Sequence, residues 1–404
     1  MPHRKRVLLV AATTGYQTQM FSEAAERAGI ELLLATDRCH VLEDPWGDRA
    51  IAIKFDHPEN AADAIRESIG GDRRLDGIIA VGDRPAYVAS VAAASLRLRF
   101  HPPQAVEASR NKFLARERFR EAGLLQPEFY RIPTSSPPTG ARFYPCVLKP
   151  LGLSASRGVI RANDDREFID AFHRIRAIIQ HEEMNDAIQV ERFIEGREFA
   201  LEGVVTAGRL QAIALFDKPD PLDGPFFEET IYTTPSREPA EIQADILETT
   251  ARAIEALGLT DGPIHAEMRV NDAGVWILEV AARPIGGLCA KAIPGLEELL
   301  LLHAAGGRID PPDPILASGV MMIPIPHEGV YQAVKGVEQA RDVPDITEVI
   351  VTAKQGQIML PLPEGKSYLG FIFSNAATPA DAEEALRKAH AQLQFEILGA
   401  LPVI

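Results

Sequence analysis

The chain has 404 residues, a hydrophobic content of 46% and a formal net charge of −15 at pH 7. This length is too great for one simple hydrophobic core, so we expect two or three domains, and the composition is that of an ordinary globular protein. The negative charge argues against a nucleic-acid partner, because gripping phosphates through a broad surface requires clustered Lys and Arg.

The first part of the chain alternates strand and helix patterns. Its expected strands are residues 7–10, 31–35, 51–55 and 77–81, with helices at 17–28 and 61–69. This alternation predicts a parallel, doubly wound sheet. The first turn lacks the glycine spacing of a dinucleotide site, so we expect no NAD domain. The turn Gly82-Asp83-Arg84 follows the last strand at the edge where such sheets bind ligands, although an ordinary strand-to-helix loop explains it equally well.

The middle and last parts of the chain predict mixed α and β structure divided by proline-rich linkers. A charged helix at 109–122 and a linker at 133–140 precede a lobe with strands at 144–149 and 188–193, a helix at 165–179 and a hairpin of 199–206 with 209–216. A linker at 217–225, a helix at 239–257, an acidic hairpin and a helix at 296–305 follow. After the prolines at 311–314 we expect strands at 320–324, 349–353 and 368–374 and a helix at 379–392.

The acidic hairpin, residues 265–279, sets two carboxylates opposite each other. If 272–274 form a three-residue loop with Gly274 in the left-handed conformation, Glu267 pairs with Glu279. Like charges directly opposite each other destabilise a sheet unless a cation lies between them. Mg²⁺ takes carboxylate oxygens together with substrate phosphates, so the hairpin predicts a metal site. A solvated strand face is the alternative interpretation.

Lys149 ends an apolar strand and precedes a loop rich in Gly and Ser, which contains Ser154, Ser156, Arg157 and Gly158. Backbone N–H groups, hydroxyls and a nearby ammonium are the donors with which proteins cradle phosphates. The loop therefore suits a phosphate, and an ordinary loop beside a surface lysine remains the alternative.

The segment 189–198 follows another strand of the same lobe. Its backbone polar groups and Glu191 would suit an adenine edge, and Glu198 would suit ribose hydroxyls. A strand and turn with solvated charges explains the segment as well.

The order of these features resembles the ATP-grasp superfamily of ATP-dependent carboxylate-amine ligases, over nearly the whole chain. The series runs through Lys112, Lys149 with its loop, the segment 191–198, Glu267 and Glu279-Val-Ala-Ala-Arg283. The pattern from Glu279 to Gly287, with residues 368–373, looks most like the L-amino acid ligase and biotin-carboxylase-like branch. A biotinyl domain with its Met-Lys-Met target is absent from the sequence.

The resemblance implies an α/β and α+β architecture, the ATP-grasp fold. It consists of an N-terminal doubly wound parallel-sheet domain at residues 1–108, an ATP-grasp domain at 109–308 and a C-terminal α+β segment at 309–404 that completes the larger lobe. A small lobe at about 141–216 would be inserted in the ATP-grasp domain.

The resemblance also implies a role for each matching position. The nucleotide phosphates would be bound by Lys112 and Lys149 and covered by the loop of Ser154, Ser156 and Gly158, the adenine hinge would be Glu191, Phe193 and Ile194, and the ribose contact Glu198. Glu267 and Glu279 match the ligands of Mg²⁺, or of Mn²⁺ in its place. Arg283 matches the residue that holds the transferred phosphate or the substrate carboxylate. Ala281 stands where many members have Asn as a further metal ligand, so either water replaces it or one ion is held more weakly.

Substrate contacts are expected around these groups. Glu228 and Glu229 would bind a substrate ammonium, although a solvated loop is an equal alternative. His265 shares a strand face with Glu267 and would orient a carbonyl or tune a metal ligand, and a structural, hydrogen-bonded histidine is the favoured alternative. Gly286-Gly287, beside Arg283, would bring backbone donors to an acyl phosphate.

The implied reaction activates a carboxylate with the γ-phosphate of ATP, and an amine then attacks the acyl phosphate. Catalysis would be largely electrostatic, with Glu279 and Arg283 at the reacting phosphate. We expect an amino acid as the acid and a second amino acid as the amine, so the product is a dipeptide. The alternatives are biotin-carboxylase-like or purine-pathway chemistry with bicarbonate, and a nucleotide-binding regulatory subunit without turnover. Relatives of this fold are commonly dimers, so a homodimer is the expected assembly.

The cysteines and hydrophobic runs bear on location. Cys39, Cys146 and Cys289 are far apart, odd in number and without metal-ligand spacing, so neither a disulfide framework nor a zinc site is expected. The apolar run near the start is too short for a secretory signal, and no stretch reaches the roughly 20 apolar residues of a membrane span. We therefore expect a cytoplasmic protein without a membrane partner.

Overall fold

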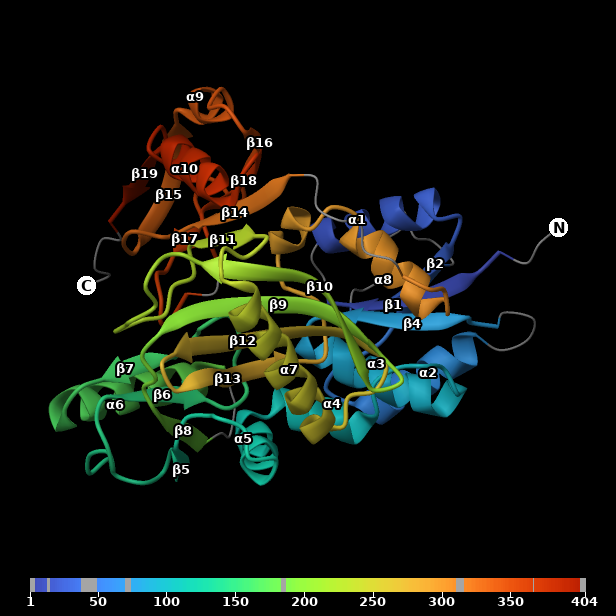
Figure 1. Ribbon diagram of the computed structural model, residues 1–404, viewed down its shortest axis with the longest axis horizontal. Helices are drawn as coiled ribbons and strands as arrows, with labels where there is room; N and C mark the ends of the chain where they lie inside the picture. Colours follow the sequence, from blue (N-terminus) through green and yellow to red (C-terminus); the bar gives the residue numbers. More distant parts are fainter. Residues whose placement is uncertain are drawn as a thin grey trace.

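The computed structural model describes residues 4–12, 15–37, 49–69, 74–182, 187–309, 316–365 and 367–399. Cys39 and the prolines at 311–314 lie outside these ranges. Within the described ranges the strands form four sheets (Figure 1). No helix in this part of the chain is long and apolar enough to cross a membrane.

The N-terminal domain is a parallel sheet in the order β3-β2-β1-β4, which confirms the predicted doubly wound sheet. Apart from the edge strand β3, its strands are short runs of Val, Ile, Leu and Ala that are buried on both faces, as helix-covered parallel sheets require. The helices α3 and α4 were not predicted. The elements are β1 (Arg6–Ala11), α1 (Gly15–Arg27), β2 (Glu31–Thr36), β3 (Ala50–Ala52), α2 (Pro58–Ser68), β4 (Gly77–Val81), α3 (Asp83–Leu96) and α4 (Pro103–Arg110).

The small lobe is an antiparallel sheet in the order β5-β8-β6-β7 with a helix packed on it. The predicted charged helix is two helices, because Asn111 ends α4 and caps α5 with its side chain. The hairpin expected at 199–216 forms, but it belongs to the large sheet and not to this lobe. The elements of the lobe are β5 (Phe129–Pro133), β6 (Cys146–Pro150), β7 (Ile160–Ala162), α6 (Asp165–His181) and β8 (Ala187–Arg192), while the preceding helix α5 (Lys112–Glu121) packs against α4 and α7 in the core of the large sheet.

The large sheet is antiparallel and has the order β13-β12-β9-β10-β11-β14-β18-β16, beside a small sheet in the order β17-β15-β19. Its elements up to residue 304 are β9 (Arg197–Thr206), β10 (Arg209–Lys218), β11 (Ile231–Thr234), α7 (Ala240–Leu257), β12 (Gly262–Asn271), β13 (Gly274–Ala281) and α8 (Leu296–Ala304). The C-terminal elements are β14 (Ala317–Ile323), β15 (Gly329–Lys335), α9 (Val337–Arg341), β16 (Ile346–Val351), β17 (Ile358–Met359), β18 (Gly370–Ala376), α10 (Pro379–His390) and β19 (Gln394–Leu398).

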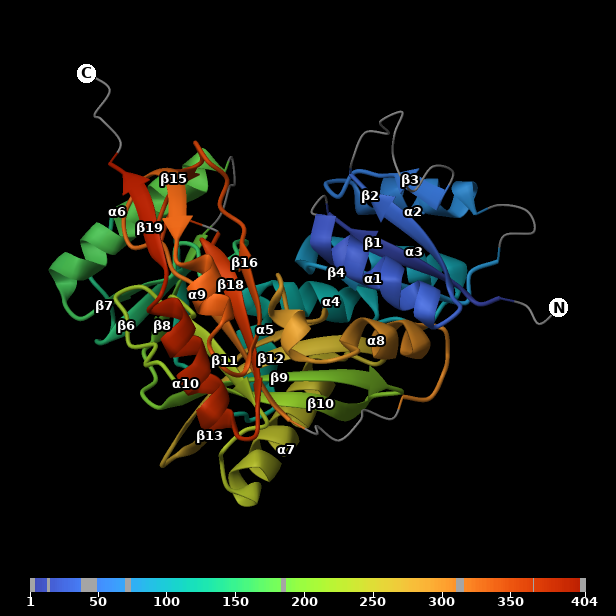
Figure 2. The same ribbon diagram turned by 90° about the horizontal axis from the view of Figure 1, so that it is seen from above.

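The hydrophobic cores show which parts are packed together. Two cores each contain residues of both the N-terminal domain and the large sheet, whereas the small lobe has a core of its own. Gly77 of β4 permits one close approach, since a Cβ there would lie 2.1 Å from the carbonyl oxygen of Ala304. The small lobe and the N-terminal domain therefore lie at opposite ends of the large sheet, and only the latter shares its core (Figure 2).

His101 gives this shared packing a measurable pH dependence. The ring is buried, Nε2 lies 3.1 Å from the carbonyl oxygen of Pro263, and burial lowers the pKa to about 4. The folded pKa of His101 lies below the unfolded value of about 6.5. The stability that the neutral ring contributes is therefore complete above pH 6.5 and is lost as the pH falls toward 4. We expect wild type to lose about 1.4 kcal/mol more than His101→Gln between pH 7.5 and 5.5. Urea unfolding at both pH values measures this, and parallel losses in the two proteins would contradict it.

Candidate active site

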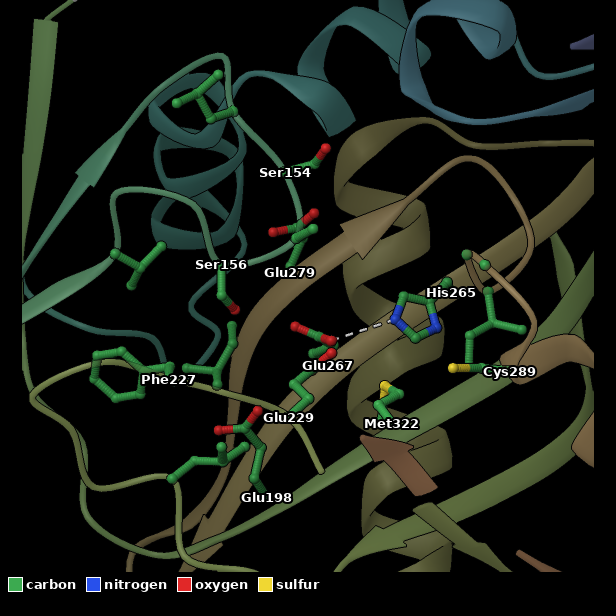
Figure 3. Close-up of a pocket in the computed structure, with 18 of the residues that line it drawn as sticks. Ser154, Ser156, Glu198, Phe227, Glu229, His265, Glu267, Glu279, Cys289 and Met322 are labelled. Atoms are coloured by element: carbon green, nitrogen blue, oxygen red, sulfur yellow. Dashed lines mark hydrogen bonds and ion pairs between the residues drawn. The ribbon is translucent and has the colours of Figure 1, made fainter. Parts of the chain in front are cut away.

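A pocket of about 560 Å³ lies where the small lobe, the large sheet and the N-terminal domain meet (Figure 3). Its walls come from the loop after β6, the end of β8, one face of the large sheet and the turn after β4. Of the residues predicted from sequence for the site, all line this pocket except Gly158 and Glu228. The fold thus gathers groups that are widely separated in sequence.

The acidic hairpin forms with a different loop from the one predicted. A two-residue loop joins β12 to β13, with Asn271 opposite Gly274, so the three-residue loop is wrong. A β-bulge then leaves Leu278 without a partner in the ladder. The extra residue restores the predicted pairing of Glu267 with Glu279, which a regular ladder from this loop would not give.

Strand alternation places the polar groups of the large sheet on the face toward the pocket. Along β12, three polar residues line the pocket, while their neighbours Ile264, Ala266, Met268 and Val270 are buried in a core. The pocket-facing residues are His265, Glu267 and Arg269, with Glu202 opposite His265 and Glu198 opposite Arg269 on β9.

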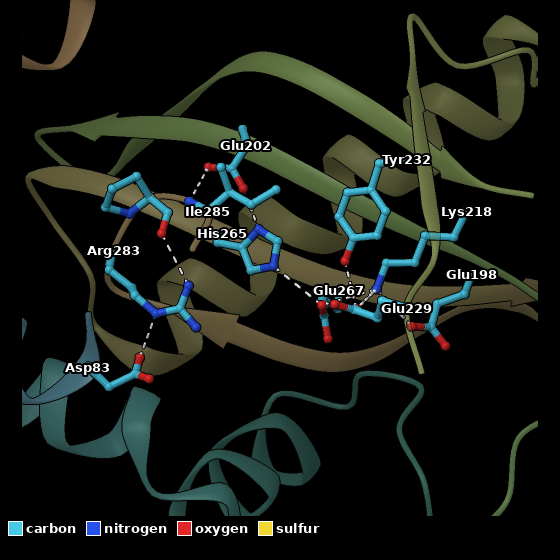
Figure 4. A network of polar contacts seen from close by, with 11 residues as sticks. Asp83, Glu198, Glu202, Lys218, Glu229, Tyr232, His265, Glu267, Arg283 and Ile285 are labelled. Atoms are coloured by element: carbon cyan, nitrogen blue, oxygen red, sulfur yellow. Dashed lines mark hydrogen bonds and ion pairs between the residues drawn. The ribbon is translucent and has the colours of Figure 1, made fainter. Parts of the chain in front are cut away.

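Lys218, the last residue of β10, sits among three of these carboxylates (Figure 4). Its Nζ donates to Glu198 at 2.9 Å, Glu229 at 2.6 Å and Glu267 at 3.1 Å, and the side chain is 2% exposed. Burial alone would lower the pKa of Lys218, but the three negative charges outweigh it and raise the pKa well above its usual value. Lys218 therefore stays positively charged inside a group of three carboxylates, Glu198, Glu229 and Glu267, which we call the acidic cluster.

The carboxylates offer an oxygen-only set of ligands. Oxygen atoms of Glu198, Glu229 and Glu267 all lie within 4.8 Å of one another. Glu279 lines the same pocket, and within the described ranges its carboxylate has no hydrogen bond or ion pair. Hard cations such as Mg²⁺ prefer such oxygen donors, so the type of donor fits the metal that the sequence predicts. Lys218 already donates to all three members of the group, and Glu279, the second predicted ligand, is not one of them.

His265 joins two carboxylates. Its Nδ1 contacts Glu202, and its Nε2 lies 3.3 Å from Glu267. Burial alone would lower the pKa of His265, but the Glu202 charge and the bonds to both carboxylates raise it to about 9. The second oxygen of Glu202 accepts the Ile285 N–H at 3.0 Å. These contacts support the structural interpretation of His265, which braces Glu267 and, through Glu202, the loop after β13.

Glu191 is buried between two cations. Its Oε1 accepts from Arg116 Nε and its Oε2 pairs with Lys149 Nζ, each at 2.7 Å. Burial alone would raise the pKa of Glu191, but these cations hold it well below its usual range. Arg116 also donates to the carbonyls of Ile277 at 3.1 Å and Leu278 at 2.7 Å. Both carboxylate oxygens of Glu191 are thus engaged, one with Lys149 and the other with Arg116 and Gln189, and the predicted adenine contact of Glu191 stays a prediction.

Lys112, the first residue of α5, holds the Gly/Ser loop. Its Nζ donates to the carbonyl of Leu153 at 2.8 Å. Ser154 and Ser156 follow and line the pocket, with Ser156 in the left-handed region at a φ of 56°. The predicted loop therefore stands at the pocket with one lysine at its base and the other beside it.

Gly158 lies outside the pocket and takes part in a contact with the C-terminal domain. Its N–H donates to the carbonyl of Pro363 at 2.9 Å, and Arg157 donates to the carbonyl of Glu364 at 3.2 Å. Arg174 of α6 binds the Glu364 carboxylate through two hydrogen bonds of 2.6 and 2.8 Å. The small lobe is thus fastened to the segment that follows β17.

Phe193 and Ile194, the other hinge residues predicted, form a buried wall of the pocket. The guanidinium of Arg161 lies 4.1 Å from the centroid of the Phe193 ring, and Arg269 donates to the carbonyl of Ile194 at 2.7 Å. Glu198 stands beside this wall and accepts from Arg269 at 2.8 Å. The apolar surface suits a flat ring such as a purine.

Arg283 begins the loop after β13 and reaches the N-terminal domain. Its Nε donates to Asp83 at 2.8 Å and its Nη1 to the carbonyl of Pro284 at 3.1 Å. Burial alone would lower the pKa of Arg283, but the Asp83 charge raises it. Gly286 and Gly287 line the pocket beside it, Gly287 with a φ of 62°. A guanidinium and a glycine-rich backbone turn thus face the same space.

Of the remaining positions considered from the sequence, one lies in the acidic cluster and two do not line the pocket. Glu229 lies in the acidic cluster, where Tyr232 donates to it at 2.6 Å, whereas Glu228 is outside the pocket. Ala281 is 2% exposed, pairs with His265 in the ladder and does not line the pocket. No metal ligand is offered from that position within the described structure.

Several residues of the site are not predicted from the sequence, among them Lys218, Arg116, Glu202, Arg269 and Asp83. Lys218 falls in the linker predicted at 217–225, although a charge at the end of an alternating strand is a usable signal for a pocket-facing residue. Arg116 and Glu202 are buried charges whose partners depend on the order of strands, and no local pattern identifies them. Asp83 was noted only as part of a turn.

Two family models match the sequence. The model of the ATP-grasp domain matches residues 142–292, and the model of the L-amino acid ligase C-terminal domain 2 matches 321–398. Among curated proteins, the alanine–anticapsin ligase of Bacillus subtilis (strain 168) is 25% identical over 357 residues, which covers 76% of this chain and 74% of that protein.

Solved structures agree with these matches. An L-amino acid ligase from Bacillus licheniformis has a TM-score of 0.82 at 25% identity, covering 98% of this chain and 100% of that chain. A carboxyaminoimidazole ribonucleotide synthase from Aspergillus clavatus, complexed with ATP, has a TM-score of 0.71 at 17% identity over 97% and 99% of the two chains, which supports a common fold alone. The chain therefore has an ATP-grasp domain at residues 142–292 and an L-amino acid ligase C-terminal domain at 321–398, on a fold shared with a solved L-amino acid ligase.

Proposed function

We propose that this chain is an ATP- and Mg²⁺-dependent ligase that joins the carboxylate of one amino acid to the amine of another, releasing ADP and phosphate. The observation that carries the proposal is one pocket, on this fold, that combines two lysines at a Gly/Ser loop, an acidic hairpin and the Arg283 loop. The L-amino acid ligase domain at 321–398 and the named activities of the relatives support amino acids as substrates.

One group of pocket residues would bind ATP and Mg²⁺, and another would bind the substrate carboxylate. Lys112 and Lys149 would neutralise the phosphates of ATP, and Glu267 and Glu279 would hold Mg²⁺. When bound, the ion supplies positive charge against the transferring phosphate. Arg283, with backbone N–H groups of the Gly286-Gly287 turn, would bind the substrate carboxylate and then the acyl phosphate, whose charge it stabilises.

The far wall of the pocket supports an apolar side chain on one substrate. Part of the pocket lining is apolar and includes Val81, Cys289, Met322 and Phe371. Figure 3 shows Cys289 and Met322 close to His265. An apolar amino acid would bury its side chain there, whereas a charged one would lose its hydration without a partner.

A screen of amino acid pairs with ATP and Mg²⁺ tests the proposal. We expect ADP and phosphate to appear only with a productive pair, together with a dipeptide detected by mass spectrometry. ADP formation that requires bicarbonate, or ATP binding without hydrolysis for every pair, would contradict the proposal.

Lys149→Ala is expected to raise the KM for ATP about tenfold or more, because a hydrogen bond to a charged group contributes about 1.5–3 kcal/mol. The KM for the amino acids should change far less. Kinetics with each substrate varied in turn measure both values, and Lys388→Ala, which removes an exposed lysine of α10, is the control. Unchanged ATP affinity would remove Lys149 from the nucleotide site.

A further inference from the structure

We propose that Asp83, a residue of the N-terminal domain, is a positioning residue that holds Arg283 in the orientation needed at the substrate carboxylate and acyl phosphate. This inference rests on the proposed function. It also explains the Gly82-Asp83-Arg84 turn, whose position at the edge of the parallel sheet the nucleotide site leaves unexplained.

The backbone directs Asp83 into the pocket. It is the first residue of α3, directly after the end of β4, and Gly82 before it has a φ of 99°. A φ of this sign favours glycine, so the turn that aims Asp83 depends on that residue. The side chain lines the pocket opposite Arg283.

The contact between the two side chains is charge-assisted and largely shielded from water. Asp83 Oδ1 accepts from Arg283 Nε at 2.8 Å, and the side chains are 30% and 14% exposed. Since Nη1 donates to Pro284, Nη2 is the guanidinium nitrogen that has no partner within the described ranges (Figure 4). Asp83 therefore fixes the plane of the guanidinium and leaves one edge for a ligand.

A second contact joins the same domain to the other end of the loop. Gln17 of α1 donates from Nε2 to the carbonyl of Gly287 at 3.1 Å. Between these ends the Ile285 N–H is held by Glu202. Because the N-terminal domain shares its cores with the large sheet, these three contacts fix the loop from two sides.

The test is a double-mutant cycle with Asp83→Asn, which keeps the size and removes the charge, and Arg283→Lys. We expect Asp83→Asn to lower kcat/KM for the amino acid about tenfold, with the KM for ATP within about twofold of wild type. In the Arg283→Lys background the same change should have little further effect, since Asp83 acts through Arg283. Asp83→Glu, which keeps the charge, should recover part of the loss.

Asp56→Asn is the matched control. It removes the exposed ion pair of Arg84, the residue after Asp83, and should leave all constants unchanged. Losses that multiply in the double variant, or an Asp83→Asn enzyme equal to wild type, would overturn the positioning role while the ligase activity stands. A wild-type protein without ligase activity on any amino acid pair would overturn the proposed function and this inference together.

Discussion

Glu279→Gln is expected to fold like wild type and to lose Mg²⁺-dependent turnover by about a hundredfold or more. The carboxylate lines the pocket and has no hydrogen bond or ion pair within the described ranges, so its replacement removes no such contact of the folded protein. Glutamine has nearly the same shape but lacks the charge that attracts a divalent cation. Since a catalytic metal contributes several kcal/mol of charge stabilisation, weakening its site costs two or more factors of ten.

Two measurements check this expectation. ADP formation is followed while Mg²⁺ is titrated, and far-UV circular dichroism with thermal unfolding confirms the fold. Asp272→Asn, which neutralises an exposed carboxylate in the loop of the same hairpin, should retain activity. Near-normal turnover of Glu279→Gln at low Mg²⁺ would refute the metal role of this residue.

Lys218→Met is expected to destabilise the fold by about 3–5 kcal/mol, the usual cost of leaving buried charges uncompensated. The variant removes the cation that pairs with Glu198, Glu229 and Glu267. Lys335→Met breaks an exposed pair with Glu396, and we expect a loss below about 1 kcal/mol there. Denaturant unfolding of both variants at pH 8 measures the difference.

The same variant should respond to pH in a defined direction. Without the ammonium, burial and mutual repulsion disfavour the charged forms of the clustered carboxylates in the folded state. Protonation then favours the folded state, so the loss of stability should shrink as the pH falls from 8 to 5. A small loss that is equal at both pH values would show that the cluster does not depend on Lys218.

Local patterns predicted the elements with strong periodicity. The parallel N-terminal sheet followed from strands of Val, Ile and Leu alternating with helices, and the helices at 165–179 and 379–392 were found within two residues at each end. The prediction that Glu267 pairs with Glu279 is correct, although the predicted loop is wrong. The loop is one residue shorter than predicted, and the unpaired Leu278 of the bulge compensates for this difference in register.

Local sequence patterns could not predict the order of strands in the sheets, because that order depends on pairing between distant segments. The hairpin at 199–216 was expected in the small lobe, and only long-range pairing with β12 and β11 assigns it to the large sheet. For the same reason Lys218 was read as part of a linker, and its three partners come from β9, β12 and the segment before β11. Asp83 and Arg283 are 200 residues apart, and only the packed cores bring them together.

Arg116 has a consequence for motion. On one side its guanidinium holds two carbonyls of β13 in the large sheet, and on the other it holds the Glu191 carboxylate of β8 in the small lobe. One buried side chain therefore couples the sheet that carries Lys149 to the strand that carries Glu279. Any rotation of the small lobe against the large sheet would have to break or strain these bonds, together with those that Arg157 and Arg174 make to Glu364.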